Sequence, residues 1–361
     1  MGGTPPVSIL TSGIGLGVYI PALLIQRQIA RLDICAEVEL LERYFTADGQ
    51  QRQLALQRAC RQSFALAQMA HRMTRDVGDA LDGPRIDGLL QRWAGERRRH
   101  FMVWSGFWLP LLERYRALVR APLQIDCCRI DAEISASFRV HAGLVPDATE
   151  VWLWSWAEKR TVFEIPVVDA LPLAFHERDD RVVVHGGGWG LGTYRSRHAE
   201  LARTPWARDV VVHDAADAVG ARSFDRAFMI DPTWRPWEHS DSAPTFPPFA
   251  EIGHSYHSES HALFELIRRS KAIVSKPGGG TLIDSLSSAT PVVLLEPYGY
   301  AEASNGALWR HLGFGISYDD WRDSGFSAEL LQRLHENLQR RARNGPDYPR
   351  AYVDRIAGLR A

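Results

Sequence analysis

Hydrophobic and polar residues follow one another in blocks that predict strands alternating with helices. Residues 7–11 form a short β-rich run that ends at a glycine-rich turn, 13–17, and apolar residues at helical spacing continue to position 29. A strand, a glycine turn and a helix in this order open a βα unit of a parallel sheet. Further strands are predicted at 36–45, 123–130, 150–156 and 161–168. Residues 50–119 have a helical pattern, interrupted near 82–84, that contains four aromatic residues expected in a helix core: Phe101, Trp104, Phe107 and Trp108.

The second half of the chain repeats this order. After a proline-containing, charged segment, an apolar run at 181–184 leads into the glycine-rich stretch 185–192. We also predict a long loop at 231–249, a terminal helix at 350–359 and further strands at 209–213, 227–230, 272–275 and 291–295. The sequence therefore predicts an α/β fold of two Rossmann-like domains that face a cleft. We expect an N-terminal domain in 1–172, a C-terminal domain in 173–345, and a helix in 346–361 that returns to the N-terminal domain.

Composition and charge exclude several classes of protein. Because 42 Lys and Arg residues nearly balance 43 Asp and Glu, no overall charge attracts nucleic acid or an anionic membrane. No stretch approaches the roughly 18 apolar residues of a membrane span, and the first residues lack the pattern of a signal peptide. The cysteines have no metal-ligand spacing and are expected to be reduced thiols, which favours a cytoplasmic protein; they are Cys35, Cys60, Cys127 and Cys128.

The motif with the clearest chemistry is Lys-Pro-Gly-Gly-Gly-Thr at 276–281, between a predicted strand and a predicted helix. Glycines let the backbone approach a ligand closely. The first N–H groups of a helix are unpaired donors at its positive end, and a diphosphate suits that place. The Thr281 hydroxyl would be a further donor. Because such a turn also occurs without any ligand, the motif alone leaves both interpretations open.

The residues that follow this motif resemble the donor-binding half of GT-B nucleotide-sugar glycosyltransferases. The similarity is to the group that contains the UDP-glycosyltransferases and the N-acetylglucosaminyltransferase of peptidoglycan synthesis. Gly306 stands where that family has an alanine. Two other glycine turns, 13–17 and 186–188, match the family's N-terminal loop and the first turn of its C-terminal domain. The landmarks that carry the resemblance, in chain order, are Gly278 to Thr281, Asp284, Pro291, Pro297, Glu302, Asn305 and Gly313 to Gly315.

The resemblance implies a role for each landmark. Asp284 would accept both ribose hydroxyls of the nucleotide, Glu302 would bind the sugar hydroxyls, and Asn305 would hold either backbone or ligand. From the residues alone, Asp284 also suits helix capping and Glu302 an exposed loop carboxylate. No metal or cofactor is expected, and the UDP-sugar would act as a co-substrate. The remaining expected donor-binding residues are Gly15, Gly17, Gly187, Gly188, Gly279, Gly280 and Thr281.

The catalytic base is the main departure from the family. Many relatives carry a histidine directly after the N-terminal glycine loop, placed to deprotonate the acceptor, whereas this chain has Val18. Inverting transfer needs a base within hydrogen-bond reach of the attacking group. Asp131 is the first candidate, because the carboxyl ends of parallel strands face the crevice, although a helix cap or turn residue is equally consistent. Glu133 is the second candidate, and Ser135 lies close to both.

Three histidines cluster before a predicted helix near residue 263. His257 and His261 are four residues apart and would share a helical face, with His254 nearby. Because no third ligand accompanies them, we predict no metal site. Alternatively, one of the three histidines lies near the base or the phosphates of the donor.

The sequence therefore favours a metal-independent glycosyltransferase that moves a sugar from a UDP-sugar to a small-molecule acceptor, such as a secondary metabolite. A nucleotide-sugar hydrolase and a non-catalytic nucleotide-sugar-binding protein of the same fold remain alternatives. A dehydrogenase is disfavoured, because dinucleotide folds end their second strand with an acidic residue. Here Glu37 and Glu39 lie within that predicted strand.

Overall fold

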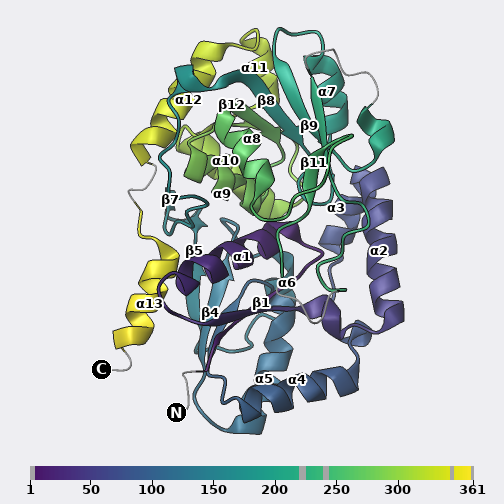
Figure 1. Ribbon diagram of the computed structural model, residues 1–361, viewed down its shortest axis with the longest axis vertical. Helices are drawn as coiled ribbons and strands as arrows, with labels where there is room; N and C mark the ends of the chain where they lie inside the picture. The colour runs from purple at the N-terminus through teal and green to yellow at the C-terminus, as the bar shows by residue number, and fades with distance from the viewer. Residues whose placement is uncertain (1–4, 219–224, 239–243, 342–344, 359–361) are drawn as a thin grey trace.

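The chain folds into two α/β lobes, one above the other in Figure 1. The computed structural model describes residues 5–218, 225–238, 244–341 and 345–358. Each lobe contains one large sheet, and we call them the N-terminal and C-terminal lobes. The predicted α/β fold with two Rossmann-like units is confirmed, whereas the proposed boundaries at residues 172 and 345 stay predictions. Among the described residues, no helix is both long and apolar enough to cross a bilayer.

The N-terminal sheet has the strand order β2-β1-β3-β4-β5, and all neighbouring strands are parallel. Parallel strands are covered on both faces, which explains their nearly continuous apolar runs. The strands are β1 Val7–Thr11, β2 Ala36–Leu40, β3 His100–Val103, β4 Gln124–Arg129 and β5 Thr149–Trp152. The α-helices are α1 Leu16–Ala30, α2 Ala47–Gln62, α3 Phe64–Arg72, α4 Gly83–Gly95, α5 Leu109–Val119 and α6 Ala136–Val140.

The prediction of an all-helical stretch over residues 50–119 is wrong at β3. This strand lies between β1 and β4 in the middle of the sheet. Four apolar residues are too few to distinguish a buried strand from a helix by their period, and helices flank them on both sides. Phe101 and Trp108 are fully buried in the core, but they belong to β3 and to the short 3₁₀ helix after it. Residues 41–44 likewise form a 3₁₀ helix instead of extending β2.

The C-terminal sheet has the order β11-β10-β9-β8-β12-β13-β14, and only the β10–β11 pair is antiparallel. Strand β11 follows the predicted loop 231–249, of which residues 239–243 lie outside the described residues. The strands are β8 Asp179–His185, β9 Ala207–Val212, β10 Arg226–Ile230, β11 Phe249–Glu251, β12 Ser270–Ser275, β13 Val292–Leu294 and β14 Gly315–Ser317. The helices are α7 Tyr194–Leu201, α8 Ala262–Arg269, α9 Gly279–Ser288, α10 Tyr300–His311, α11 Tyr318–Asp323 and α12 Ala328–Arg341.

The segment between the two sheets contacts both lobes. The strands predicted at 150–156 and 161–168 are reduced to β5 and a small antiparallel pair, β6 Trp154–Ser155 with β7 Arg160–Thr161. Trp154 packs edge-on against Trp309 of α10, with 5.2 Å between ring centroids. Aromatic pairs of this geometry add to the free energy of burial. The segment therefore joins the lobes by packing as well as by covalent connection.

The last helix, α13 Tyr348–Gly358, packs on the N-terminal lobe beside α1 (Figure 1). The Tyr348 hydroxyl donates to Asp126 Oδ2 of β4 at 2.8 Å, and Arg355 forms an ion pair with the same carboxylate. Asp126 is buried, and buried carboxylates are stabilised by such partners. The chain thus ends on the lobe in which it begins.

Candidate functional site

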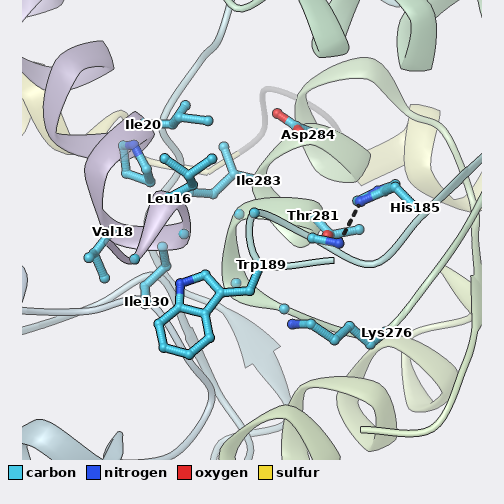
Figure 2. Close-up of a pocket in the computed structure, with 18 of the residues that line it drawn as sticks. Leu16, Val18, Ile20, Ile130, His185, Trp189, Lys276, Thr281, Ile283 and Asp284 are labelled. Atoms are coloured by element: carbon cyan, nitrogen blue, oxygen red, sulfur yellow. Dashed lines mark hydrogen bonds between the residues drawn. The ribbon is translucent and has the colours of Figure 1, made fainter. Parts of the chain in front are cut away.

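A cavity of about 390 Å³ lies between the lobes (Figure 2). Its walls come from the segments that follow β1, β4, β8, β9 and β12, together with the first turns of α1 and α9. Open α/β sheets bind their ligands outside the carboxyl ends of the strands, where the loops carry varied chemistry. The volume also lies within the usual range of small-molecule sites. The cavity is therefore the candidate functional site.

The turn 276–281 runs from β12 into α9 and lines this cavity. Because α9 begins at Gly279, the N–H groups of Gly279, Gly280 and Thr281 have no acceptor within the helix. The ladder starts with Leu282, whose N–H donates to the Gly278 carbonyl at 3.1 Å. A Cβ on Gly279 would lie 2.6 Å from the Ile130 carbonyl of the other lobe, so this position requires glycine. Free amides at the positive end of a helix make a binding place for phosphate.

A second glycine turn follows β8 and lines the same cavity. Gly187 has a φ angle of 70°, a left-handed conformation that glycine adopts without strain. Its N–H donates to His185 Nδ1 at 3.1 Å (Figure 2), and its carbonyl accepts from His213 Nε2 at 3.1 Å. Burial lowers the pKa of both imidazoles to about 3. Both rings are therefore neutral at pH 7 and support the turn by hydrogen bonding, a role that the sequence did not suggest.

The two glycine turns of the C-terminal lobe lie side by side. A Cβ on Gly187 would be 3.3 Å from Lys276 Cε. Gly188 continues toward the other lobe, where a Cβ would meet Leu16 Cβ at 2.5 Å. Next to it, the Trp189 indole N–H donates to the Ile14 carbonyl at 2.6 Å. These contacts bring the C-terminal glycine turns and the N-terminal glycine turn into one cavity.

The N-terminal glycine turn forms the facing wall. Gly15 and Gly17 line the cavity, and a Cβ on Gly280 would lie 3.5 Å from Gly17 Cα. The preceding amide of Gly13 is already engaged, since it donates to the buried Glu42 carboxylate at 2.7 Å. The ladder of α1 starts with Val18, whose N–H donates to the Gly15 carbonyl at 2.9 Å. The first amides of α1 therefore also lack an acceptor within their helix, and Gly17 lets the two helix starts approach closely.

Lys276 places a cation at the centre of the C-terminal wall. Its ammonium group forms an ion pair with Glu302 Oε1, and the other carboxylate oxygen accepts from the Tyr298 N–H at 2.7 Å. Only 12% of the Lys276 side chain and 11% of the Glu302 side chain are exposed. Figure 2 shows the Lys276 side chain extending toward Trp189. The sequence analysis assigned Glu302 to the site but gave no role to Lys276, although it begins the glycine motif.

Asp284 lies one turn into α9 and is nearly buried at the cavity wall. The two oxygens of its carboxylate lie 3.1 and 3.2 Å from His261 Nε2, and the His261 ring stacks on Phe246 with 6.0 Å between centroids. This hydrogen bond fixes the direction of the carboxylate. It also corrects one expectation: His257 and His261 share no helical face, because α8 begins at Ala262 and His257 pairs with β11 in an isolated bridge.

Asp131, after β4, lines the cavity from the N-terminal lobe. Its Oδ1 accepts from Asn305 Nδ2 at 2.8 Å. Burial raises the pKa of Asp131 to about 6, and the nearby Glu302 carboxylate also raises it, while Asn305 and Lys276 oppose the change. A carboxylate with a pKa near 6 is ionised at neutral pH and is still basic enough to accept a proton.

Asn305 is fully buried and does not line the cavity. Its Oδ1 accepts from the Ala132 N–H at 2.7 Å, and its Nδ2 donates to the Pro277 carbonyl at 2.9 Å as well as to Asp131. Asn305 therefore ties the loop after β4 to the loop after β12. Of the two roles left open by the sequence, the structure shows the backbone-holding one.

The other candidate bases are placed differently. Glu133 is not among the residues that line the cavity, whereas Ser135 and Val18 are. His71 of α3 also lines it, and its Nε2 has no hydrogen-bond partner among the described residues. Burial lowers the pKa of His71, so the ring is neutral at pH 7. His71 is a further candidate base that the sequence analysis missed, because no motif surrounds it.

Two parts of the cavity are apolar. The first is the face of α1, opposite α9 in Figure 2; it contains Leu16, Val18, Ile20, Pro21 and Leu24. The second lies at the ends of β10 and α8; it contains Ile230, Pro247, Phe249 and Leu263. Flat apolar walls of this kind suit a ring system, whereas the polar centre between them suits charged groups. Among the described residues, no group of three or more His, Cys, Asp or Glu side chains is placed to hold a metal ion.

Comparison with known proteins finds similarity to solved structures. No family model and no curated protein sequence matches the chain. SnogD from Streptomyces nogalater, a glycosyltransferase, superposes with a TM-score of 0.54 at 16% identity, covering 99% of this chain and 100% of that one. VinC, solved with dTDP, gives 0.57 at 10% identity over 98% of both chains. The spinosyn rhamnosyltransferase SpnG gives 0.58 at 12% identity over 98% of this chain and 100% of its own. The chain therefore has the GT-B fold of these glycosyltransferases over nearly its whole length.

Proposed function

We propose that the protein is a metal-independent glycosyltransferase that takes a sugar from a UDP-sugar and passes it to a small-molecule acceptor. One observation carries the proposal: the free amides at the start of α9, the Gly187 turn and Lys276 line a single cavity between two lobes. Amide donors and a cation converging on one point suit a diphosphate. The GT-B fold supports the same assignment, since sugar transfer is the activity named for its structural neighbours.

The donor would lie along the C-terminal wall. Its diphosphate would accept from the amides of Gly279 to Thr281 and pair with Lys276, and its ribose would donate to Asp284, whose direction His261 fixes. The uracil ring would enter the apolar slot at the ends of β10 and α8. The sugar would lie near Glu302. This order leaves no charged group of the donor in an apolar region, which is the requirement for burying a charged ligand.

Transfer would proceed by direct attack of the acceptor on the anomeric carbon. Asp131 would remove the proton from the attacking hydroxyl or amine, because it is the carboxylate that lines the cavity from the N-terminal lobe. Negative charge develops on the departing UDP, and preorganised amides with Lys276 would stabilise it. These groups do the work that a divalent cation performs in metal-dependent enzymes.

The acceptor would lie against the apolar face of α1. The side chains there offer packing and no hydrogen bonds, so an acceptor with a large apolar surface is favoured. One of the structural neighbours, SpnG, has been solved with spinosyn aglycone. A small, largely apolar secondary metabolite is the class that this wall suits.

The nucleotide is tested by isothermal titration of UDP, dUDP, dTDP and GDP with EDTA present. If Asp284 accepts the ribose hydroxyls, UDP binds at least about tenfold more tightly than dUDP, because a hydrogen bond to a buried charge is lost. In the Asp284→Ala protein this ratio falls to within about threefold. Since VinC is described with dTDP and SpnG with thymidine diphosphate, equal or tighter binding of dTDP would replace UDP in the proposal.

Product analysis then separates the alternatives. Incubation with the UDP-sugar alone distinguishes a hydrolase, which releases free sugar at the rate seen with acceptors. Tight UDP binding without turnover over a panel of acceptors would identify a non-catalytic binding protein. Binding of NAD with no response to any nucleotide sugar would reject the proposed function.

A further inference from the structure

A second cavity, of about 300 Å³, adjoins the first one. Leu16, Gly188, His213 and Ile230 line both cavities, and Gly188 lies against Leu16 of the other lobe. One wall of the second cavity is α2 of the N-terminal lobe, and the other is the segment 231–237 of the C-terminal lobe. No part of the proposed sugar transfer uses this space. We call it the arginine cavity, after three of the residues that line it: Arg58, Arg61 and Arg235.

These three guanidinium groups come from both lobes and have no ion pair with an acidic side chain among the described residues. Arg58 and Arg61 lie on α2, and Arg235 lies across the cavity from them. One acidic residue, Asp231, also lines the cavity, but its Oδ1 accepts from the N–H and the hydroxyl of Thr233, at 2.8 and 2.7 Å. The lining thus carries an excess of positive charge.

Arg61 brings part of this positive charge to the contact between the lobes. Its Nε donates to the Trp189 carbonyl at 3.1 Å, so the side chain is fixed against the C-terminal lobe. Burial lowers the pKa of Arg61, and the neighbouring cations Arg195 and Arg235 lower it further, whereas Tyr194 and Asp217 oppose the change. Arg195 has its own partner, Asp217, at 2.8 Å. Like charges held together in a partly buried place repel each other, and the repulsion opposes closure of the lobes.

We propose that the arginine cavity binds an oxyanion, a phosphate or a carboxylate, and that the bound anion holds the lobes in the arrangement described. Guanidinium groups recognise such anions through paired, charge-assisted hydrogen bonds. The space exceeds one phosphate, and the indole rings of Trp234 and Trp237 form part of its lining. A phosphate or carboxylate carried by a larger ring-containing molecule therefore suits it as well as a free anion.

The same geometry couples the two cavities. The donor cavity is complete only when Gly188 meets Leu16, and an anion between α2 and Arg235 favours that contact. Linkage requires that each ligand then increase the affinity of the other by the same factor. This coupling rests on the proposed function, because it takes UDP as the ligand of the first cavity, whereas anion binding itself does not.

The test is a calorimetric titration of inorganic phosphate, and separately of phenyl phosphate, at constant ionic strength. We expect Arg58→Gln and Arg235→Gln to weaken phosphate binding by at least about fivefold, since each loses a charge-assisted contact. The matched control is Arg52→Gln, which removes the same charge from the same helix outside the cavity and should stay within about twofold. Tighter binding of phenyl phosphate indicates an anion on a larger molecule, and equal binding indicates the free anion.

Two further measurements distinguish a failure of the arginine cavity from a failure of the proposed function. Lys276→Met should lose UDP affinity and keep the phosphate response, since Lys276 does not line the arginine cavity. Because free phosphate also suits the α9 amides, the coupling is measured at phosphate concentrations that fill the arginine cavity without displacing UDP. There phosphate should tighten UDP binding about twofold to fivefold, and Arg58→Gln should abolish that gain. If UDP fails to bind while the arginine variants still weaken phosphate, the proposed function alone is rejected. If phosphate binds equally in all arginine variants, or not beyond chloride, the arginine cavity is not an anion site.

Discussion

The two walls of the donor cavity differ in chemistry. The C-terminal wall is charged, with Lys276 paired to Glu302 and Asp284 paired to His261, and all four side chains are nearly buried. The N-terminal wall is mainly apolar, and Asp131 and His71 are its titratable members. A charged wall with fixed partners suits a donor whose groups are constant, whereas an apolar wall with one base suits acceptors that vary in shape. Under the proposed function, this difference assigns donor recognition to the C-terminal lobe and acceptor activation to the N-terminal lobe.

Asp131→Asn tests the role of the N-terminal wall and should produce the largest change in turnover. If Asp131 is the base, UDP release from the UDP-sugar falls by about 100-fold to 10,000-fold, the usual contribution of general base catalysis. UDP affinity should stay within about twofold, because the donor wall is intact. His71→Gln is the matched change at the other candidate base. A full loss in His71→Gln with a small loss in Asp131→Asn would transfer the role to His71.

The same substitution has an expected effect on stability. The folded state raises the pKa of Asp131 from 3.8 to about 6, so it binds this proton more tightly than the unfolded chain does. Wild-type stability from this group is therefore greatest below about pH 4 and is lost as pH rises through 6. Asp131→Asn should gain about 1–2 kcal/mol at pH 7.5 and nothing at pH 4. Urea unfolding at the two pH values measures the difference, and a uniform loss at both would contradict it.

Gly188→Ala tests whether the walls must touch, and its effect should be smaller. An added Cβ would lie 2.5 Å from Leu16 Cβ, and overpacking of this kind costs about 1–3 kcal/mol. UDP affinity should therefore weaken about tenfold, because the lobes must move apart to relieve the clash. The control is Leu16→Gly, which removes the clashing atoms. Combined with Gly188→Ala, it should recover at least about fivefold; no recovery would mean that the glycine serves the ligand and not the lobe contact.

The contrast between the walls also explains what the sequence predicted. The βα periodicity and the glycine turns are local in the chain, so they predicted the two-lobed fold. Asp284 and Glu302, two of the later landmarks, line the cavity as expected, whereas their roles toward a donor stay predictions. Strand β3 was missed because four buried apolar residues carry no readable period. The expectation for His257 and His261 failed because both residues precede Ala262, the first residue of α8.

The residues that sequence analysis missed share a different cause. His185 and His213 act by supporting Gly187 from two separate strands, and His71 reaches the cavity from a helix without any motif. His213 and His71 act through segments far apart in the chain, whereas His185 bonds to a residue only two positions away. Lys276 is the exception, since it directly precedes the glycines, and a cation in that place was a signal that the sequence contained.

Asn305→Asp tests how a residue of the C-terminal lobe influences Asp131 on the N-terminal wall. Its effect on turnover should be the smallest of these substitutions. Asn305 Nδ2 donates to Asp131, and this hydrogen bond opposes the rise in the pKa of Asp131. An aspartate of the same shape keeps an acceptor for the Ala132 N–H but replaces the donor with a second carboxyl group, so the two must share a proton. The acid limb of the pH–rate profile, expected near pH 6, should move upward by about one unit. An unmoved limb would show that Asp131 does not set the profile, and the base would then lie elsewhere on the N-terminal wall.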